Sequence, residues 1–186
     1  PGVVNYRDLV AKLGEATADR VVAIWTSYLE GDLTHDEAVD LIAVTITAAN
    51  ERATVLADLG LAATLTVATR SVVLPHGLTR PADDAQRLAK AARTLLAIRD
   101  VTEERVARLG RSEPLNAAQE ARGAGIATSR LVDGWTRNVS GSGCQLCTWW
   151  SRDGRVWPAD HTMPRHKGCT CTQTPVLAER VRPVQH

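Results

Sequence analysis

The sequence predicts a mainly α-helical protein, with an elongated helical body followed by a small Cys/His-rich module that resembles a β-hairpin. Three observations support this prediction. Apolar residues recur at helical spacing through most of the first 137 residues, all four cysteines lie in the last fifty, and the helical spacing disappears after Asn138. We therefore divide the chain into a body at 1–137, a module at 138–176 and a tail at 177–186.

The first half of the body is expected to contain three helices. Apolar residues follow one helical face from 4 to 29, and Gly31 ends this helix. A capping box of Thr34 and Glu37 begins a second helix, which is expected to run to about Asp58 with a break near Gly60. The segment 61–74 alternates partly like a strand, but its alanines and its helical neighbours favour a third helix.

The second half of the body is expected to contain three further helices after a turn-rich link. They are predicted at 82–99, at 102–109 with Gly110 as its end, and from 112 to about Trp135. The Ser/Gly-rich stretch at 139–143 is expected to be a flexible approach to the first cysteine.

Composition supports thin helices and gives no strong indication of a ligand. The chain is 44% hydrophobic but has no Phe, so its apolar content is mostly Ala, Val and Leu. From residue 137 onward, seven Lys and Arg against three Asp and Glu give a net charge of +4, within a total of +1. This asymmetry is too modest to indicate nucleic-acid binding by itself. We expect no membrane span, because no run of about 18 apolar residues occurs.

The cysteines form a C-x2-C pair and a C-x-C pair, a spacing typical of a tetrahedral metal site. The candidate ligands are Cys144, Cys147, His166, Cys169 and Cys171. We predict that the first pair and two of the other three residues bind one structural zinc ion. Gly168 could provide the bend that brings both members of the second pair to one ion. No secretory signal pattern begins the sequence, so we expect synthesis in the cytoplasm, where cysteines favour metal over disulfides.

Several alternatives to this interpretation remain open at the level of sequence. The four cysteines could form two disulfides or remain as buried free thiols. The three tryptophans of the module could stack on bases, although a role in its core is favoured; they are Trp149, Trp150 and Trp157. A set of basic residues could be solvated or could contact phosphate groups or a partner, namely Arg152, Arg155, Arg165 and Lys167.

The C-terminal motif resembles that of the MuF-like head morphogenesis proteins of tailed phages. The residues that carry the resemblance span about 35 positions: Cys144, Cys147, Gly154, Trp157, His166, Cys169, Cys171 and Pro175. The resemblance implies a minor capsid protein that associates with the portal protein or the major capsid protein. It also implies a role in head assembly and in DNA packaging or delivery, and a place in the virion, in the capsid interior or at the portal vertex. The basic residues named above could then contact double-stranded DNA independently of its sequence.

Two other classes of function compete with this interpretation, although we predict no enzymatic activity. Asp160, His161 and Pro164 resemble the D-H-x-x-P segment of zinc-containing HNH nucleases. Such nucleases need a second C-x2-C pair and a further helix, for which the residues after Cys171 leave little room. A zinc-ribbon adaptor is the second alternative. The chain also lacks the G-x-S-x-G motif of a serine hydrolase, and no local motif suggests a capsid protease.

Overall fold

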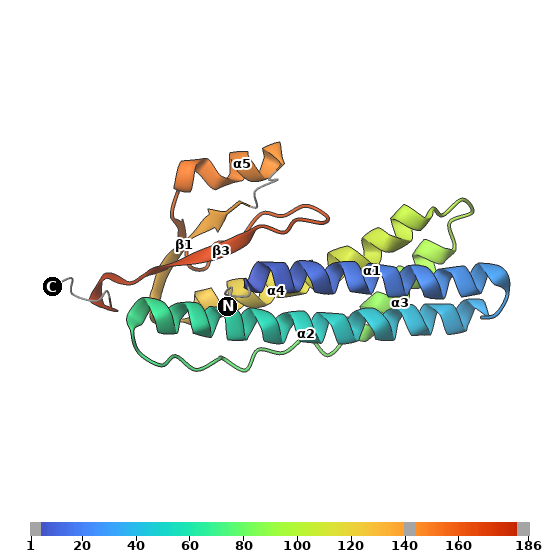
Figure 1. Cartoon of the computed structure of the whole chain (residues 1–186), viewed down its shortest axis with the longest axis horizontal. Helices are drawn as coiled ribbons and strands as arrows, with labels where there is room; N and C mark the ends of the chain where they lie inside the picture. Colours follow the sequence, from blue (N-terminus) through green and yellow to red (C-terminus); the bar gives the residue numbers. More distant parts are fainter. Residues whose placement is uncertain (1–4, 140–143, 182–186) are drawn as a thin grey trace.

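A computed structural model describes residues 5–139 and 144–181. Four helices form an elongated bundle, and a small sheet with one short helix lies at one end of it (Figure 1). The bundle helices are α1 (Tyr6–Glu30), α2 (His35–Thr69), α3 (Asp84–Leu96) and α4 (Glu103–Thr128). The predicted fold class, a helical body followed by a small β module with a Cys/His cluster, is therefore confirmed.

The ends of the first two helices follow the capping residues of the sequence. The amide of Gly31 donates to the last turn of α1, and its φ of 84° suits glycine. At the start of α2, the Thr34 hydroxyl accepts from the Glu37 amide, and the Glu37 carboxylate accepts from the Thr34 amide at 2.8 Å. The predicted capping box is therefore present.

The expected break near Gly60 is wrong, because α2 continues through this residue to Thr69. The segment predicted as a separate helix at 61–74 is the C-terminal half of α2 and the start of the following link. A Cβ atom at position 60 would lie 3.0 Å from the ring of Tyr6. The glycine therefore makes room for a neighbouring aromatic ring and does not end the helix.

The predicted division of the last body helices is also wrong. A single helix, α4, replaces the segments expected at 102–109 and from 112, and it contains Pro114. A Cβ at Gly110 would lie 2.9 Å from the Cα of Ala18, so this glycine permits close packing of α4 on α1. The helix ends at Thr128, and Trp135 lies in a strand.

Small apolar residues from all four helices make up the core of the body. One cluster joins α1, α2, α3 and α4 and includes Val21, Ile42, Ile46, Leu88 and Val106, all fully buried. A second cluster, nearer the sheet, contains mostly alanines of α2 and α4. These small side chains allow the helices to approach closely, as the composition suggested.

The link between α2 and α3 is attached to the bundle by a buried carboxylate. Asp58 accepts hydrogen bonds from the backbone amides of His76, Gly77 and Leu78 at 2.8 to 3.1 Å. Burial would raise the pKa of Asp58, but these hydrogen bonds hold it below its usual value. The link is therefore fixed along α2 without secondary structure of its own.

The sheet has three antiparallel strands in the order β2-β1-β3. They are β1 (Val132–Asn138), β2 (Trp157–Pro158) and β3 (Thr172–Leu177), and Trp135 of β1 faces Trp157 on one side and Pro175 on the other. Between β1 and β2 lie α5 (Gln145–Ser151) and a short 3-10 helix, η1 (Arg152–Gly154), and η2 (Glu179–Val181) follows β3. The strand β1 spans the expected boundary at 137/138. The expected flexible approach lies outside the described residues except for Val139, and so does the end of the expected tail.

The sheet is packed directly on the bundle. The fully buried Trp135 shares a cluster with Leu61 and Leu65 of α2 and Ile126 of α4. From α4, the buried Arg122 donates through Nε to the carbonyl oxygen of Gln173 at 2.7 Å. This contact area places the cysteine-containing segments against the side of α4.

Candidate metal centre

The first cysteine pair lies at the start of α5. Cys144 is the exposed N-cap residue of this helix, and Cys147 is buried in its first turn. The amide of Thr148 donates to the carbonyl oxygen of Cys144 at 3.1 Å, which begins the helical turn. The C-x2-C spacing therefore places both thiols on the same end of a short helix.

The second pair enters the cluster through a turn. The amide of Cys169 donates to the carbonyl oxygen of His166 at 3.1 Å, and Gly168 has a φ of 75°. The bend expected at Gly168 is thus confirmed. Cys169 and Cys171 are both buried, immediately before β3.

The five predicted ligands converge in two overlapping groups. One contains Cys144, Cys147 and His166, and the other contains Cys147, Cys169 and Cys171; within each, the donor atoms lie within 4.8 Å of one another. The Nε2 atom of His166 lies 3.2 Å from the Sγ atoms of Cys144 and Cys147, and the Sγ atoms of Cys147 and Cys169 are 3.6 Å apart. These residues could bind a metal ion.

One of the separations, between the Sγ atoms of Cys147 and Cys169, matches the edge of a metal tetrahedron, and the two at His166 are shorter. Zinc–ligand bonds of about 2.3 Å to sulfur and about 2.0 Å to nitrogen place neighbouring ligands roughly 3.5 to 3.8 Å apart. The Cys147–Cys169 separation of 3.6 Å lies in this range, and both are free thiols. It is much longer than a disulfide bond of about 2.05 Å. The donor set therefore fits a thiolate-binding ion.

Burial opposes ionisation of the inner thiols. It raises the pKa of Cys147 to about 11, and a hydrogen bond with Cys171 together with burial raises the pKa of Cys169. At Cys144 the backbone amide of Cys147 has the opposite effect and lowers the thiol pKa. Because a metal ligand must be a thiolate, binding of a cation would release protons from the inner pair.

Arg137 contacts the cluster and was not among the residues predicted for it. This side chain of β1 is buried, and its Nη1 lies 3.8 Å from the Sγ of Cys147 and 3.9 Å from the Sγ of Cys169. Its Nη2 donates to the carbonyl oxygen of Pro164, and its guanidinium lies 5.3 Å from the centre of the Trp150 ring. Side chains two residues apart in a strand lie on the same face, so Arg137 shares the face of the buried Trp135. The sequence would have indicated this position if the segment had been predicted as a strand.

The body contributes to the cluster through Gln119 of α4, which the sequence analysis also missed. This buried side chain donates through Nε2 to the carbonyl oxygens of Cys169 at 2.7 Å and Cys171 at 3.1 Å. The C-x-C backbone is thereby held against the bundle. The helical periodicity could not identify this role. It indicates which residues of α4 face inward but not which residue each of them contacts.

The prediction that three tryptophans form the core of the module is only partly correct. Trp150 and Trp157 are half-buried, but Trp149 is 61% exposed. The fully buried ring is that of Trp135, which stacks on Trp157 with ring centres 6.2 Å apart. Trp135 was missed as a core residue because the sequence predicted it at the end of a helix and not in the sheet.

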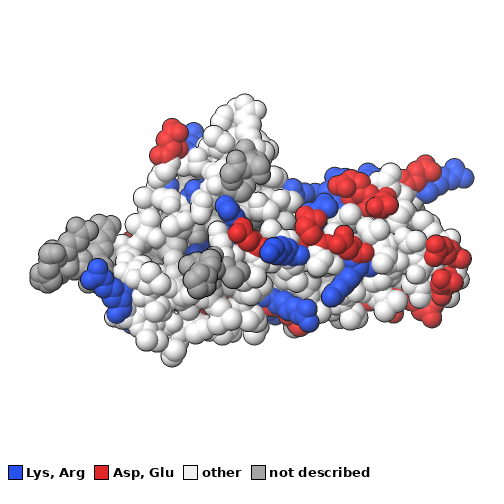
Figure 2. All heavy atoms as spheres, viewed as in Figure 1, with Lys and Arg blue, Asp and Glu red and all other residues white. Residues whose placement is uncertain are grey.

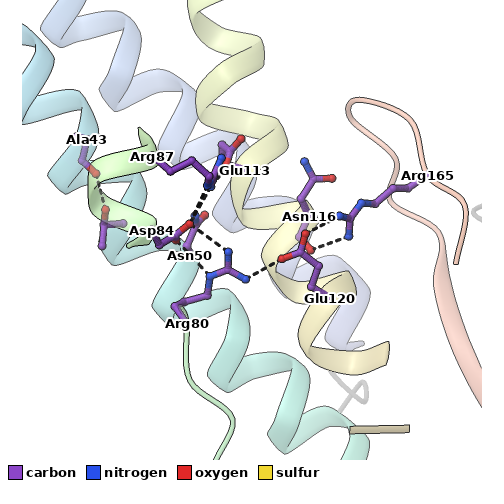
Figure 3. A network of polar contacts seen from close by, with 10 residues as sticks. Ala43, Asn50, Arg80, Asp84, Arg87, Glu113, Asn116, Glu120 and Arg165 are labelled. Carbon is purple, nitrogen blue, oxygen red and sulfur yellow. Dashed lines mark hydrogen bonds and ion pairs between the residues drawn. The ribbon is translucent and has the colours of Figure 1, made fainter. Parts of the chain in front are cut away.

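The four basic residues predicted to contact a partner have different surroundings. Arg165 is bound to α4, since its Nη2 lies 2.5 Å from Oε1 of Glu120 and its Nη1 donates to the carbonyl oxygen of Asn116 (Figure 3). Arg155 lies over the ring of Trp157 at 4.4 Å, and Arg152 is exposed. The structure therefore does not gather these side chains into one surface.

Figure 3 shows the polar network to which Arg165 belongs. Glu120 also accepts a hydrogen bond from Arg80 at 2.9 Å, and Arg80 in turn donates to the buried Asp84 of α3. Arg87 links Asp84 to α4 through an ion pair with Glu113. The network thus connects α3, α4 and the segment that carries the metal-ligand candidates.

Lys167, the fourth predicted contact residue, lies at a groove of about 600 Å³ between α3 and α4. Basic side chains from both helices line the same groove: Arg87, Lys90, Arg105 and Arg108. In the described part of the chain, Lys90, Arg105, Arg108 and Lys167 form no ion pair. Four cations without an ion pair among the described residues therefore lie at this groove.

His161 and Asp160, the basis of the nuclease alternative, lie outside both donor groups. The imidazole of His161 stacks on Trp157 with ring centres 4.4 Å apart and an interplanar angle of 10°. Its carbonyl oxygen accepts a hydrogen bond from Nε1 of Trp135 at 3.0 Å. These contacts make His161 part of the aromatic packing of the sheet.

No protein-family model, curated protein or solved structure matches this chain. Within the described residues, no helix is long and apolar enough to cross a membrane.

Proposed function

We propose that the Cys/His cluster binds one structural zinc ion and that the protein is a non-enzymatic minor capsid component of a tailed phage. The observation that supports zinc binding is the convergence of four thiols and one imidazole in two overlapping groups between α5, the segment 164–171 and α4. The MuF-like motif supports the proposed role as a minor capsid component.

The donor set favours a structural ion over a catalytic one. Cys144, Cys147 and His166 supply three ligands, and Cys169 or Cys171 supplies the fourth, so protein side chains can fill a tetrahedron. A catalytic zinc keeps one position for water or substrate, whereas a closed set leaves none. The adjacent Arg137 guanidinium would balance part of the thiolate charge, as residues behind a metal site commonly do.

The proposed partners are the portal protein and the major capsid protein of the same phage, together with packaged DNA. The groove between α3 and α4 is the DNA-contact surface that we favour, because four of its five cations form no ion pair among the described residues; Arg87 is the paired one. Phosphate contact of this kind is independent of sequence and weakens with salt. Of the residues first predicted for this role, Lys167 belongs to the groove.

Native mass spectrometry with zinc and thiol quantification tests the metal. We expect one zinc per chain, lost to a chelator with a matching gain of reactive thiols. Cys169→Ser and Cys171→Ser would identify the fourth ligand, because only one of them should abolish zinc binding. A chain that stays metal-free when refolded with zinc would refute the structural site.

Two further experiments test the capsid role. The chain should co-purify with the portal or capsid protein encoded beside it, and absence of both from the complex would contradict the proposal.

For DNA, Arg105→Gln/Arg108→Gln should lower the salt dependence of duplex binding by about two phosphate contacts. The matched double variant Lys12→Gln/Arg20→Gln, exposed on α1, should leave it unchanged.

A further inference from the structure

The outward face of α2 is apolar along most of its length. Eight exposed positions follow one another at spacings of three or four residues, and Arg52 is the one charged member. They are Leu41, Val44, Ala48, Arg52, Val55, Leu59, Ala63 and Val67. We call this set the α2 stripe. It extends over about 39 Å at 1.5 Å per residue.

Such a face is unusual for a surface helix, which normally presents polar residues to solvent. Val44 is 67% exposed, Val55 51% and Leu59 50%. Figure 2 shows few charged side chains over the region where Figure 1 places the C-terminal half of α2. Contiguous exposed apolar surface of this kind marks an interaction site.

We propose that the α2 stripe is the interface of a twofold homodimer in which α2 packs antiparallel on α2 of the partner subunit. This inference goes beyond the proposed function and uses neither the metal centre nor the basic groove. It rests on a symmetry within the stripe. Within residues 44–59, positions equally far from the midpoint between residues 51 and 52 complement each other in size and in charge, whereas Val67 has no apolar counterpart.

The size complementarity follows from the antiparallel register. Val44 lies opposite Leu59 of the partner subunit, and Ala48 lies opposite Val55 of the partner subunit. Leu41 similarly lies opposite Ala63 of the partner subunit to within one position. Each pair occurs twice because of the twofold axis. Larger side chains thus face alanine in two of the three layers, which permits close approach of the two helices.

Charge selects the antiparallel direction. Glu51 and Arg52 are both exposed, and neither forms an ion pair within residues 5–139 and 144–181. In the antiparallel register, Arg52 lies opposite Glu51 of the partner subunit, and the axis repeats this pair. A parallel arrangement in register would instead place Arg52 opposite its own copy. The single charged position of the stripe is therefore matched only in the antiparallel dimer.

Two hollows beside the stripe can receive the side chains of the second helix. One of about 740 Å³ lies toward the start of α1 and β3 and is lined in part by Leu59, Ala63 and Val67. The other, of about 380 Å³, lies toward the link before α3 and is lined in part by Glu51 and Val55. Ridges of a partner helix need such recesses along both sides of their contact.

Sedimentation equilibrium of the full chain, from about 1 to 100 µM, tests the proposal by mass action. We expect a monomer–dimer equilibrium that Val55→Glu/Leu59→Glu shifts to monomer at every concentration. Val72→Glu, at an 84% exposed position outside the stripe, is the matched control and should still dimerise. Circular dichroism would verify that all variants keep their helices. A wild-type chain that is monomeric throughout would overturn the proposal, as would a dimer that survives Val55→Glu/Leu59→Glu.

Charge exchange tests the register. Glu51→Arg or Arg52→Glu alone places like charges opposite each other twice, and we expect roughly tenfold weaker dimerisation. The double variant Glu51→Arg/Arg52→Glu should restore it, and a mixture of the two single variants should form a heterodimer. If the double variant is no better than the single variants, the antiparallel register is wrong.

Discussion

The helical body and the cysteine cluster are stabilised in different ways. In the body, apolar side chains from four helices bury one another in extended clusters. Around α5, the buried cluster consists of Cys147, Cys169 and Cys171, with Val139 partly buried against it. So small an apolar cluster cannot order a segment of this size, and natural proteins add disulfides or metals in such cases. On the proposed function, metal coordination would stabilise the region where apolar burial ends.

The strand β1 lies between these two regions and belongs to both. Trp135 packs on α2 and α4, whereas Arg137, two residues later, contacts the thiols of the cluster. Loss of the metal should therefore loosen α5 and the segment 164–171 but not β1. On the proposed function, the unit that depends on the metal would be smaller than the predicted module at 138–176.

The largest expected effect is that of removing the metal. In Cys147→Ser, or after chelation, amide protection in α5 and 164–171 should fall by about 100-fold or more. The amides of the four bundle helices should change little, because their core does not include the cluster. Hydrogen exchange measured by mass spectrometry would check this. An equal loss of protection in both regions would show that the comparison is wrong.

Arg137→Met should weaken the proposed metal site. It removes a buried cation beside the thiols and the donor to the Pro164 carbonyl, and we expect roughly 10-fold weaker zinc binding. Competition with a zinc-binding dye would measure the affinity. Arg152→Met, at an exposed position of the same module, is the control. Equal zinc affinities of the two variants would exclude the charge-balancing role of Arg137.

The buried carboxylate of Asp84 should make the body sensitive to acid. Burial would raise its pKa, but hydrogen bonds from Arg80, Asn50 and Arg87 lower it to about 2, below the usual value of about 3.9. The resulting stabilisation, roughly 2 kcal/mol, is complete above about pH 4 and is lost as the pH falls through 2. Urea unfolding of metal-free protein across this range should show the loss, and Asp84→Asn should remove that pH dependence. An unchanged pH profile in Asp84→Asn would contradict the assignment.

A further prediction distinguishes two glycines of α4. Gly110→Ala should destabilise the body by roughly 1 to 3 kcal/mol, because its Cβ would lie 2.9 Å from Ala18. In Gly123→Ala the nearest atom would be the Gln173 side chain at 3.4 Å, so improved helix propensity should leave stability equal or slightly higher. Thermal unfolding of both variants would test this difference. A Gly123→Ala variant that is less stable than Gly110→Ala would contradict it.

Much of the body was predictable because its signals are local. The capping box at Thr34, the end of α1 at Gly31 and the period of the apolar residues act within one or two helical turns. The errors occurred at Gly60 and Gly110, where glycine serves a distant contact. A sequence shows that a residue lacks a side chain but does not show which neighbour needs the space.

The sequence by itself determined the helical class, the caps and the five candidate ligands, because residue type and spacing express them directly. The tertiary structure decided that Arg137 and Gln119 support the cluster and that Arg165 is bound to α4. It also decided that the α2 stripe faces outward, whereas an equally apolar face of the same helix is buried. The physical reason is that burial and pairing depend on which elements meet in space, and contacts between residues far apart in the chain leave no period in its sequence.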